Sequence, residues 1–217
     1  MFISKIIQSK VRHFNLEKVS KYVISSCYDM RDEYVKNGEL IKNDENIIRN
    51  VLLEEFLNTD DQRQKYGLKN YKFTPENLEH YSIETKLYSG RTDIRVSIKS
   101  DFCESEAYYI IECKRIDGSS PLNKAFVKEG VMRFTSGKYS SFYNQSCMLG
   151  FVVKEGIDLV ENAKKIIDYQ KECSLDSSVA STHEYKINDL HLQFIKHFDK
   201  LDLNLEYLFF DFASIIE

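Results

Sequence analysis

The spacing of apolar residues changes partway along this chain, and that change limits the fold more than any other feature of the sequence. Early in the chain, apolar side chains recur at helical spacing, for example at Ile48, Leu52 and Phe56. From Asp93 to Ile98 apolar and polar residues alternate instead, which is typical of a β-strand with one buried face. Because helical patterns return between and after the strand patterns, we expect an α/β domain with a mixed central sheet flanked by helices.

The individual elements follow from the same patterns and from residues that cap helices or form turns. Helices are predicted over residues 15–35, 44–58, 122–136 and 158–173, with a short helix near Pro75. Strands are predicted over residues 82–88, 93–98, 108–114 and 147–154. The tail from Tyr185 is predicted to mix strand and helix.

The domain organisation is predicted to be simple. No repeat, low-complexity tract or Ser/Pro-rich linker interrupts the chain, so residues 1–217 are expected to form a single domain. Within it we expect a helical N-terminal extension (1–40), a core that carries the motif described below (44–154) and a C-terminal completion of the fold (155–217).

Composition excludes several classes of protein. The 30 Lys and Arg residues against 34 Asp and Glu give a net charge of −4, which excludes a uniformly basic nucleic-acid coat protein. The 5 cysteines include no CxxC pair, so a thiolate zinc site is not expected and the thiols indicate a reducing compartment. The longest apolar run, Cys147 to Val153, is far shorter than the roughly 20 residues of a membrane-spanning helix. We therefore expect a cytoplasmic protein with no membrane segment.

Three charged residues form the most informative pattern. Asp93 opens one predicted strand, and Glu112 and Lys114 lie two residues apart in the next strand, which is otherwise apolar. Side chains two apart in a strand project from the same face, so Glu112 and Lys114 point together, and Asp93 can converge on them from the neighbouring strand. Two carboxylates and a main-chain carbonyl form an all-oxygen site that suits Mg²⁺ better than zinc. A lysine beside such a site can orient water and stabilise charge that develops on a phosphate.

This pattern resembles the PD-(D/E)xK nuclease superfamily, whose members have the restriction-endonuclease-like fold. Asp93 matches the first acid of the family motif, and Glu112 and Lys114 match its second acid and its lysine. Thr92 stands where the family usually has proline, and the resemblance covers about residues 44–153.

The resemblance also implies a glutamate on the helix before the hairpin, close to the metal. Glu45 is the candidate for this role, where it would assist a second metal ion, and Glu55 is the alternative.

The activity that the resemblance implies is hydrolysis of DNA phosphodiester bonds with Mg²⁺, or Mn²⁺, as cofactor. Asp93, Glu112 and the main-chain carbonyl of Cys113 would hold the metal, and Lys114 would position the attacking water. Members of the superfamily often act in restriction, phage defence or repair, and a homodimer or a defence-system partner protein is left open.

Two other interpretations of the motif compete with catalysis. The first is an inactive module on the same fold that binds nucleic acid or a partner protein. The second is coincidence, in which Glu112 and Lys114 form an ion pair on an exposed edge strand. The apolar run from Tyr108 to Ile111 argues against an edge strand, because such a strand is expected to alternate.

Basic residues after the motif suggest where DNA would lie. The candidates for phosphate contacts are Lys124, Lys128, Arg133 and Lys138. For any one of these side chains a solvated helix face is an equally good explanation, but it explains the cluster less well.

Overall fold

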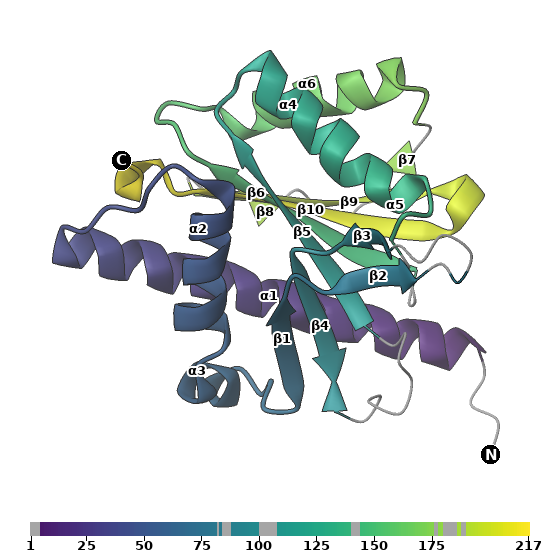
Figure 1. Ribbon diagram of the computed structural model, residues 1–217, viewed down its shortest axis with the longest axis horizontal. Helices are drawn as coiled ribbons and strands as arrows, with labels where there is room; N and C mark the ends of the chain where they lie inside the picture. The colour runs from purple at the N-terminus through teal and green to yellow at the C-terminus, as the bar shows by residue number, and fades with distance from the viewer. Residues whose placement is uncertain are drawn as a thin grey trace.

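The computed structural model describes residues 5–81, 83, 88–99, 108–139, 144–175, 178–179, 186–187 and 190–217. Over these residues the protein has an eight-stranded central sheet (Figure 1). Its strands in spatial order are β1 (Tyr71–Pro75), β4 (Ile94–Ile98), β5 (Tyr108–Ile116), β6 (Gln145–Val152), β10 (Leu203–Asp211), β9 (His191–Phe198) and β7 (Ser178–Val179), and β8 (Lys186–Ile187) also pairs with β9. A separate two-stranded ribbon consists of β2 (Leu78–Tyr81) and β3 (Tyr88–Arg91).

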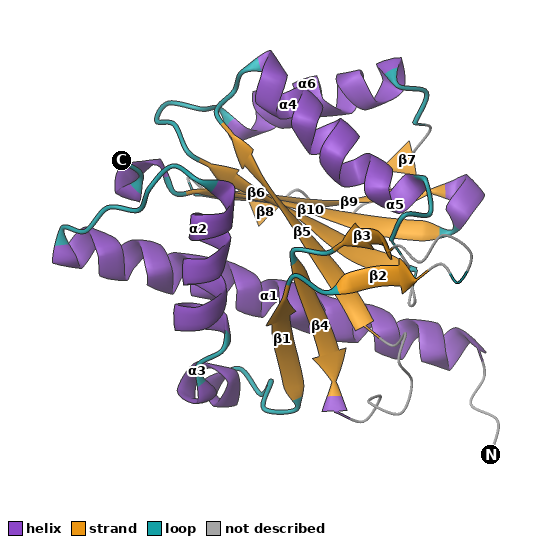
Figure 2. Ribbon diagram, in the orientation of Figure 1, coloured by secondary structure: helices purple, strands orange, loops and turns teal. Residues whose placement is uncertain are grey.

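The sheet is mixed, as the sequence predicts. β5 pairs with β6 in parallel, and β6 pairs with β10 in parallel, whereas the other described pairs are antiparallel. Helices cover both faces (Figure 2), which makes the architecture α/β. Both side-chain faces of β5 and β6 are almost completely buried, as expected for strands at the centre of such a sheet.

One face of the sheet is covered by the N-terminal helices. They are α1 (Lys5–Asn37), α2 (Glu45–Val51), the π-helical segment η1 (Leu52–Leu57) and α3 (Asp60–Lys65). Leu16, Val19 and Val23 of α1 are buried in the same apolar cluster as Ile111 of β5. The N-terminal helix, predicted as an extension, thus supplies part of the core.

The other face is covered by helices from the second half of the chain. They are α4 (Ser120–Phe126), the π-helical segment η3 (Val127–Val131), α5 (Met132–Thr135) and α6 (Leu159–Glu172), while two short 3-10 turns, η4 (Asp199–Leu201) and η5 (Ala213–Ile215), follow β9 and β10. Phe126 and Val131 pack here against a second apolar cluster that includes Ile110 and Phe209.

Most of the predicted elements are present, with three differences. The short helix predicted near Pro75 is wrong, because Pro75 ends strand β1. The strand predicted over residues 82–88 lies largely outside the described residues. In the tail, predicted as strand and helix mixed, the long described elements are the strands β9 and β10. Within the described ranges, no helix is both long enough and apolar enough to cross a membrane.

Candidate active site

Strand register brings the two motif acids together. Ile94 of β4 pairs with Ile111 of β5, so Asp93 and Glu112 stand one step further along the same antiparallel pair, on the opposite face. The Asp93 carboxylate is also held by the main chain, because the Cys113 N–H donates to Asp93 Oδ2 at 2.8 Å. The predicted convergence of Asp93 on Glu112 is therefore present.

Glu112 and Lys114 share the face of β5 that is covered by η3 and α5. Glu112 is fully buried, and the side chain of Lys114 is only 8% exposed. β5 lies between β4 and β6, so the edge-strand interpretation of this pair is wrong. Two charged side chains at the centre of a sheet are costly unless each is paired, so their partners decide how the site is built.

Helix α2 supplies a third carboxylate, that of Glu45. Asp44 caps this helix by accepting hydrogen bonds from the main-chain N–H groups of Asn46 and Ile47, which fixes Glu45 as its first residue. Glu45 accepts from Lys114 Nζ at 2.7 Å and from the main-chain N–H of Arg115 at 3.1 Å. The alternative candidate, Glu55, is exposed and instead lies near the Tyr34 hydroxyl.

The ammonium of Lys114 is the point on which the predicted ligand atoms converge. Its Nζ lies 2.7 Å from Glu45 Oε1, 3.3 Å from Glu112 Oε1 and 3.9 Å from Asp93 Oδ2. It also donates to the main-chain carbonyl of Cys113 at 2.8 Å. Carboxylate and carbonyl oxygens are hard donors, so the chemistry of this set fits Mg²⁺ or Mn²⁺. As arranged, however, no group of three or more His, Cys, Asp or Glu side chains among the described residues is placed to hold a metal ion.

Two arginines bind the motif acids from opposite sides. Arg49 of α2 donates from Nη1 to Asp93 Oδ1 at 3.0 Å. Arg133 of α5 donates from Nη1 to Glu112 Oε1 at 2.5 Å and to the Tyr139 hydroxyl at 2.8 Å. The Tyr139 hydroxyl in turn lies 2.9 Å from Glu112 Oε2. Each acid therefore has an arginine partner in addition to Lys114.

These surroundings perturb the ionisation of the buried groups. Burial raises the pKa of Glu112 to about 7, and the nearby Asp93 carboxylate adds to this, while Lys114 and Arg133 oppose it. Burial alone would lower the pKa of Lys114, but the carboxylates of Glu112, Asp93 and Glu45 outweigh burial and the net shift is upward. Lys114 therefore stays charged at neutral pH.

The helix that carries Arg133 approaches β5 closely because of a glycine. A Cβ atom at Gly130 in η3 would lie 2.4 Å from Met148 Cε and 3.6 Å from Lys114 Cγ. Only a residue without a side chain fits there unless Met148 moves. The π-helical segment adds a residue to the helix just before α5, and such insertions shift which side chains face the core.

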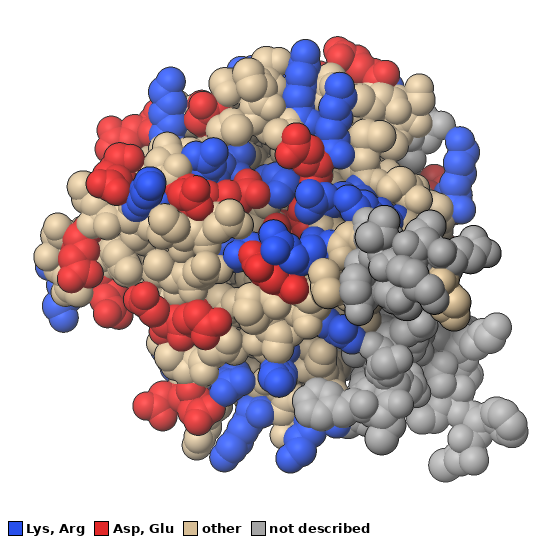
Figure 3. Space-filling view, viewed as in Figure 1, with Lys and Arg blue, Asp and Glu red and all other residues tan. Residues whose placement is uncertain are grey.

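The four predicted phosphate contacts separate into two groups. Arg133 lies in the site, and the Lys138 side chain packs against Gly90 of β3. Lys124 and Lys128 instead stand 5.3 and 5.8 Å from the ring centre of Tyr169 on α6. Figure 3 shows Lys and Arg side chains grouped with carboxylates across the middle of the face on which Figure 1 draws α2, β3 and β5.

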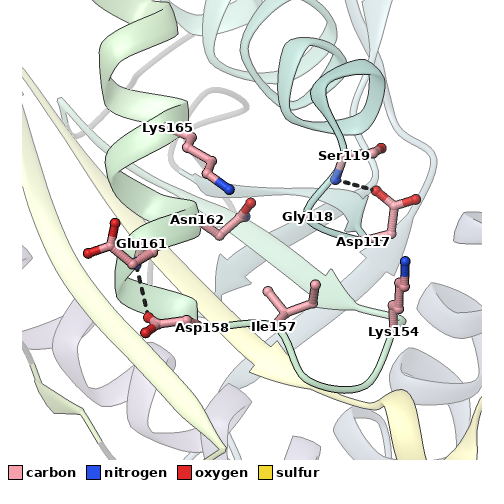
Figure 4. A pocket seen from close by; sticks show the side chains of 9 residues that line it. All are labelled: Asp117, Gly118, Ser119, Lys154, Ile157, Asp158, Glu161, Asn162 and Lys165. Atoms are coloured by element: carbon pink, nitrogen blue, oxygen red, sulfur yellow. Dashed lines mark hydrogen bonds between the residues drawn. The ribbon is translucent and has the colours of Figure 1, made fainter.

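A separate pocket of about 310 Å³ lies where β5 and β6 end and α4 and α6 begin (Figure 4). Lys154, Asn162 and Lys165 line it together with Asp117, Asp158 and Glu161. The carboxylates already have partners, since Asp117 accepts from the Ser119 N–H and Asp158 caps α6. None of the motif residues lines this pocket.

Two residues that bind the motif acids, Arg49 and Tyr139, were not predicted as part of the site from the sequence. Arg49 follows Glu45 by four residues, a spacing that puts both on one helix face, so this signal was available. Tyr139 gave no signal beyond its position in a basic and aromatic segment.

Comparison of the chain with protein-family models, with curated proteins and with solved structures finds no match.

Proposed function

We propose that this protein is a Mg²⁺-dependent nuclease that hydrolyses phosphodiester bonds in DNA. One observation carries the proposal: three carboxylates and a main-chain carbonyl, from α2, β5 and the bend before β4, meet at the ammonium of Lys114. These residues are the ones on which the sequence resemblance to the PD-(D/E)xK superfamily rests. The mixed α/β sheet is consistent with the restriction-endonuclease-like fold that the resemblance implies.

In this proposal the oxygens of Asp93, Glu112 and Cys113 would hold the metal, with Glu45 beside them. Bound Mg²⁺ supplies an activated water and neutralises charge on the phosphate. Lys114 is charged and can donate hydrogen bonds from Nζ, so it would orient the attacking water and stabilise negative charge that develops on the phosphate. Arg133 is 28% exposed, which gives its guanidinium access to a phosphate at the same place.

A non-catalytic binding module is the second candidate, and a specific observation favours it. Glu112 is already bound by Arg133, Lys114 and Tyr139, so its oxygens have protein partners without a metal. A saturated network of this kind also suits a purely structural cluster of buried charges.

A cleavage assay with matched variants separates the two candidates. Plasmid, short duplex and single-stranded DNA would be incubated with Mg²⁺ and with Mn²⁺, beside a DNA-binding measurement at fixed salt. We expect the wild type to cut, and Asp93→Asn and Glu112→Gln to lose at least about 10²-fold in rate while they still bind DNA. Glu161→Gln, at an exposed carboxylate on α6, is the control and should cut normally. A wild type that binds DNA and cuts none of the substrates with either metal would favour the binding module.

A further inference from the structure

Arg49 is a buried arginine whose guanidinium is almost completely occupied. Its side chain is 3% exposed, which is rare for arginine. Nη1 donates to Asp93 Oδ1 at 3.0 Å, and Nη2 donates to Glu76 Oε1 at 2.9 Å. Nε and Nη2 both donate to Asn50 Oδ1, at 3.1 and 2.9 Å. A planar guanidinium held by these four hydrogen bonds has one orientation, so the position of its contact with Asp93 is fixed.

This guanidinium connects α2 to two turns, the turn after β1 that carries Glu76 and the turn before β4 that carries Asp93. Glu76 has a left-handed backbone, with φ of 49°, and its main-chain N–H donates to the carbonyl of Asp93 at 3.1 Å. Glu76 thus contacts Asp93 through the main chain and through Arg49. A non-glycine residue in this conformation carries backbone strain, which the surrounding contacts must offset.

Arg49 and Glu45 act from the same face of α2, one helical turn apart. Glu45 binds Lys114 and the Arg115 N–H, and Arg49 binds Asp93. The position of one short helix therefore sets two of the three carboxylates around Lys114.

Asp93 is consequently held at both oxygens. Arg49 binds Oδ1 and the Cys113 N–H binds Oδ2, so the carboxylate cannot rotate without loss of a hydrogen bond. In this orientation Oδ2 faces Lys114 Nζ at 3.9 Å, which is the side on which the other carboxylates lie. Outer partners that orient a ligand in this way typically change metal affinity by about 10- to 100-fold when they are removed.

We infer that Arg49 is a positioning residue, which fixes the Asp93 carboxylate in the orientation that binds a divalent cation. This inference rests on the proposed function, because it takes Asp93 to be a metal ligand. The competing explanation is a buried ion pair that contributes to folding alone.

The test measures Mn²⁺ affinity on the purified, folded protein by calorimetry, with thermal unfolding recorded for each variant. Arg49→Lys keeps a positive charge but cannot bridge Asp93, Glu76 and Asn50 together. We expect its Mn²⁺ dissociation constant to rise by about 10-fold or more. Arg63→Lys is the matched control, since Arg63 is a partly buried arginine that binds Asp60 and the Tyr71 carbonyl away from the site. Its Mn²⁺ affinity should be that of the wild type.

Asp93→Asn tests whether the effect passes through Asp93. In this background Arg49→Lys should change Mn²⁺ affinity by less than about twofold, because the ligand that it positions is already impaired. A similar loss with and without the Asp93 carboxylate would overturn the inference. If Arg49→Lys does not fold, Glu76→Gln replaces it, since it weakens the second anchor of the guanidinium and leaves Arg49 in place, although it also removes the ion pair of Glu76 with Arg91. Glu76→Gln should weaken Mn²⁺ binding by about threefold or more, and unchanged affinity would overturn the inference.

The same measurements separate this inference from the proposed function. A wild type that binds Mn²⁺ without cutting DNA contradicts the nuclease proposal, while the affinities of the variants still decide the role of Arg49. If the wild type binds Mn²⁺ and Arg49→Lys binds it with the same affinity, the positioning role is overturned and the nuclease proposal stays in place. A wild type that binds no Mn²⁺ overturns both.

Discussion

Replacement of Lys114 by methionine tests the chemistry of the site most directly. Methionine is similar to lysine in length and keeps the apolar part of the side chain, but it removes the ammonium on which three carboxylates converge. If Lys114 orients water and stabilises charge in the transition state, the variant should cut DNA about 10²- to 10³-fold more slowly, because the loss of one well-placed electrostatic group costs roughly 3–4 kcal/mol.

The cost in folding stability can be bounded from the contacts that remain. Breaking a fully buried ion pair typically costs about 3–5 kcal/mol because it leaves an unpaired charge. Here each carboxylate keeps another donor: Glu112 keeps Arg133, Asp93 keeps Arg49, and Glu45 keeps the Arg115 N–H. We therefore expect the free energy of unfolding to fall by about 1–3 kcal/mol, so the variant should remain folded for assay.

The assay is single-turnover cleavage at saturating Mg²⁺, beside Mn²⁺ calorimetry and thermal unfolding. Mn²⁺ should still bind, and at least as tightly, since a positive charge has left the ligand set and the carboxylates remain. Lys128→Met, at an exposed lysine of η3 whose side chain lies near the Tyr169 ring, is the control and should cut like the wild type. Equal cleavage rates for Lys114→Met and the wild type would refute the role of Lys114 in the reaction.

Three further predictions follow from the packing and charge of the described residues. Gly130→Ala should lower the free energy of unfolding by about 1–3 kcal/mol because its Cβ overlaps Met148, and the penalty should largely disappear in a Met148→Ala background, as measured by chemical denaturation. Lys196 is 3% exposed and burial lowers its pKa, so the unfolded chain binds more protons in the window between the lowered and the ordinary lysine pKa. Lys196→Met should therefore raise the melting temperature at pH 7, and the gain should shrink as pH rises toward the ordinary lysine pKa; a gain that is constant with pH would contradict this. Lys138→Met should reduce the magnitude of the log–log salt slope of DNA binding by about 0.7–0.9, whereas Lys128→Met should leave it unchanged; equal slopes for both variants would contradict the separation of the two lysines.

The central part of the site could be predicted because it depends on local periodicity. Glu112 and Lys114 share a face through the two-residue repeat of a strand, and an antiparallel partner strand brings Asp93 opposite Glu112. Glu45 was predicted from the resemblance, which implies a glutamate on the helix before the hairpin, and the Asp44 cap makes Glu45 the first residue of that helix.

Other parts of the fold and site have no comparable local signal. Strand β1 is at an edge of the described sheet, where a terminal Pro75 is tolerated; its alternation of buried Tyr71 and Phe73 with exposed Lys72 is short, and proline is also common at the start of a helix. β10 is buried on both faces, so its run of apolar residues does not alternate and does not distinguish strand from helix. The contact from Arg49 to Asp93 joins residues 44 positions apart, and no short pattern encodes it.

The distribution of charge explains why the site depends on the complete fold. Glu112 on β5 is balanced by Arg133 from α5, and Asp93 before β4 is balanced by Arg49 from α2. A buried charge is costly unless it is paired, so both acids depend on their helix partners: Glu112 is fully buried, and the side chain of Asp93, in the bend before β4, is 14% exposed. Each helix has one of these acids to bind, and both acids also lie within 4 Å of Lys114. Docking of α2 and α5 therefore supplies the partners that let both carboxylates stay charged beside Lys114, so we expect the site to form only when both helix layers are in place.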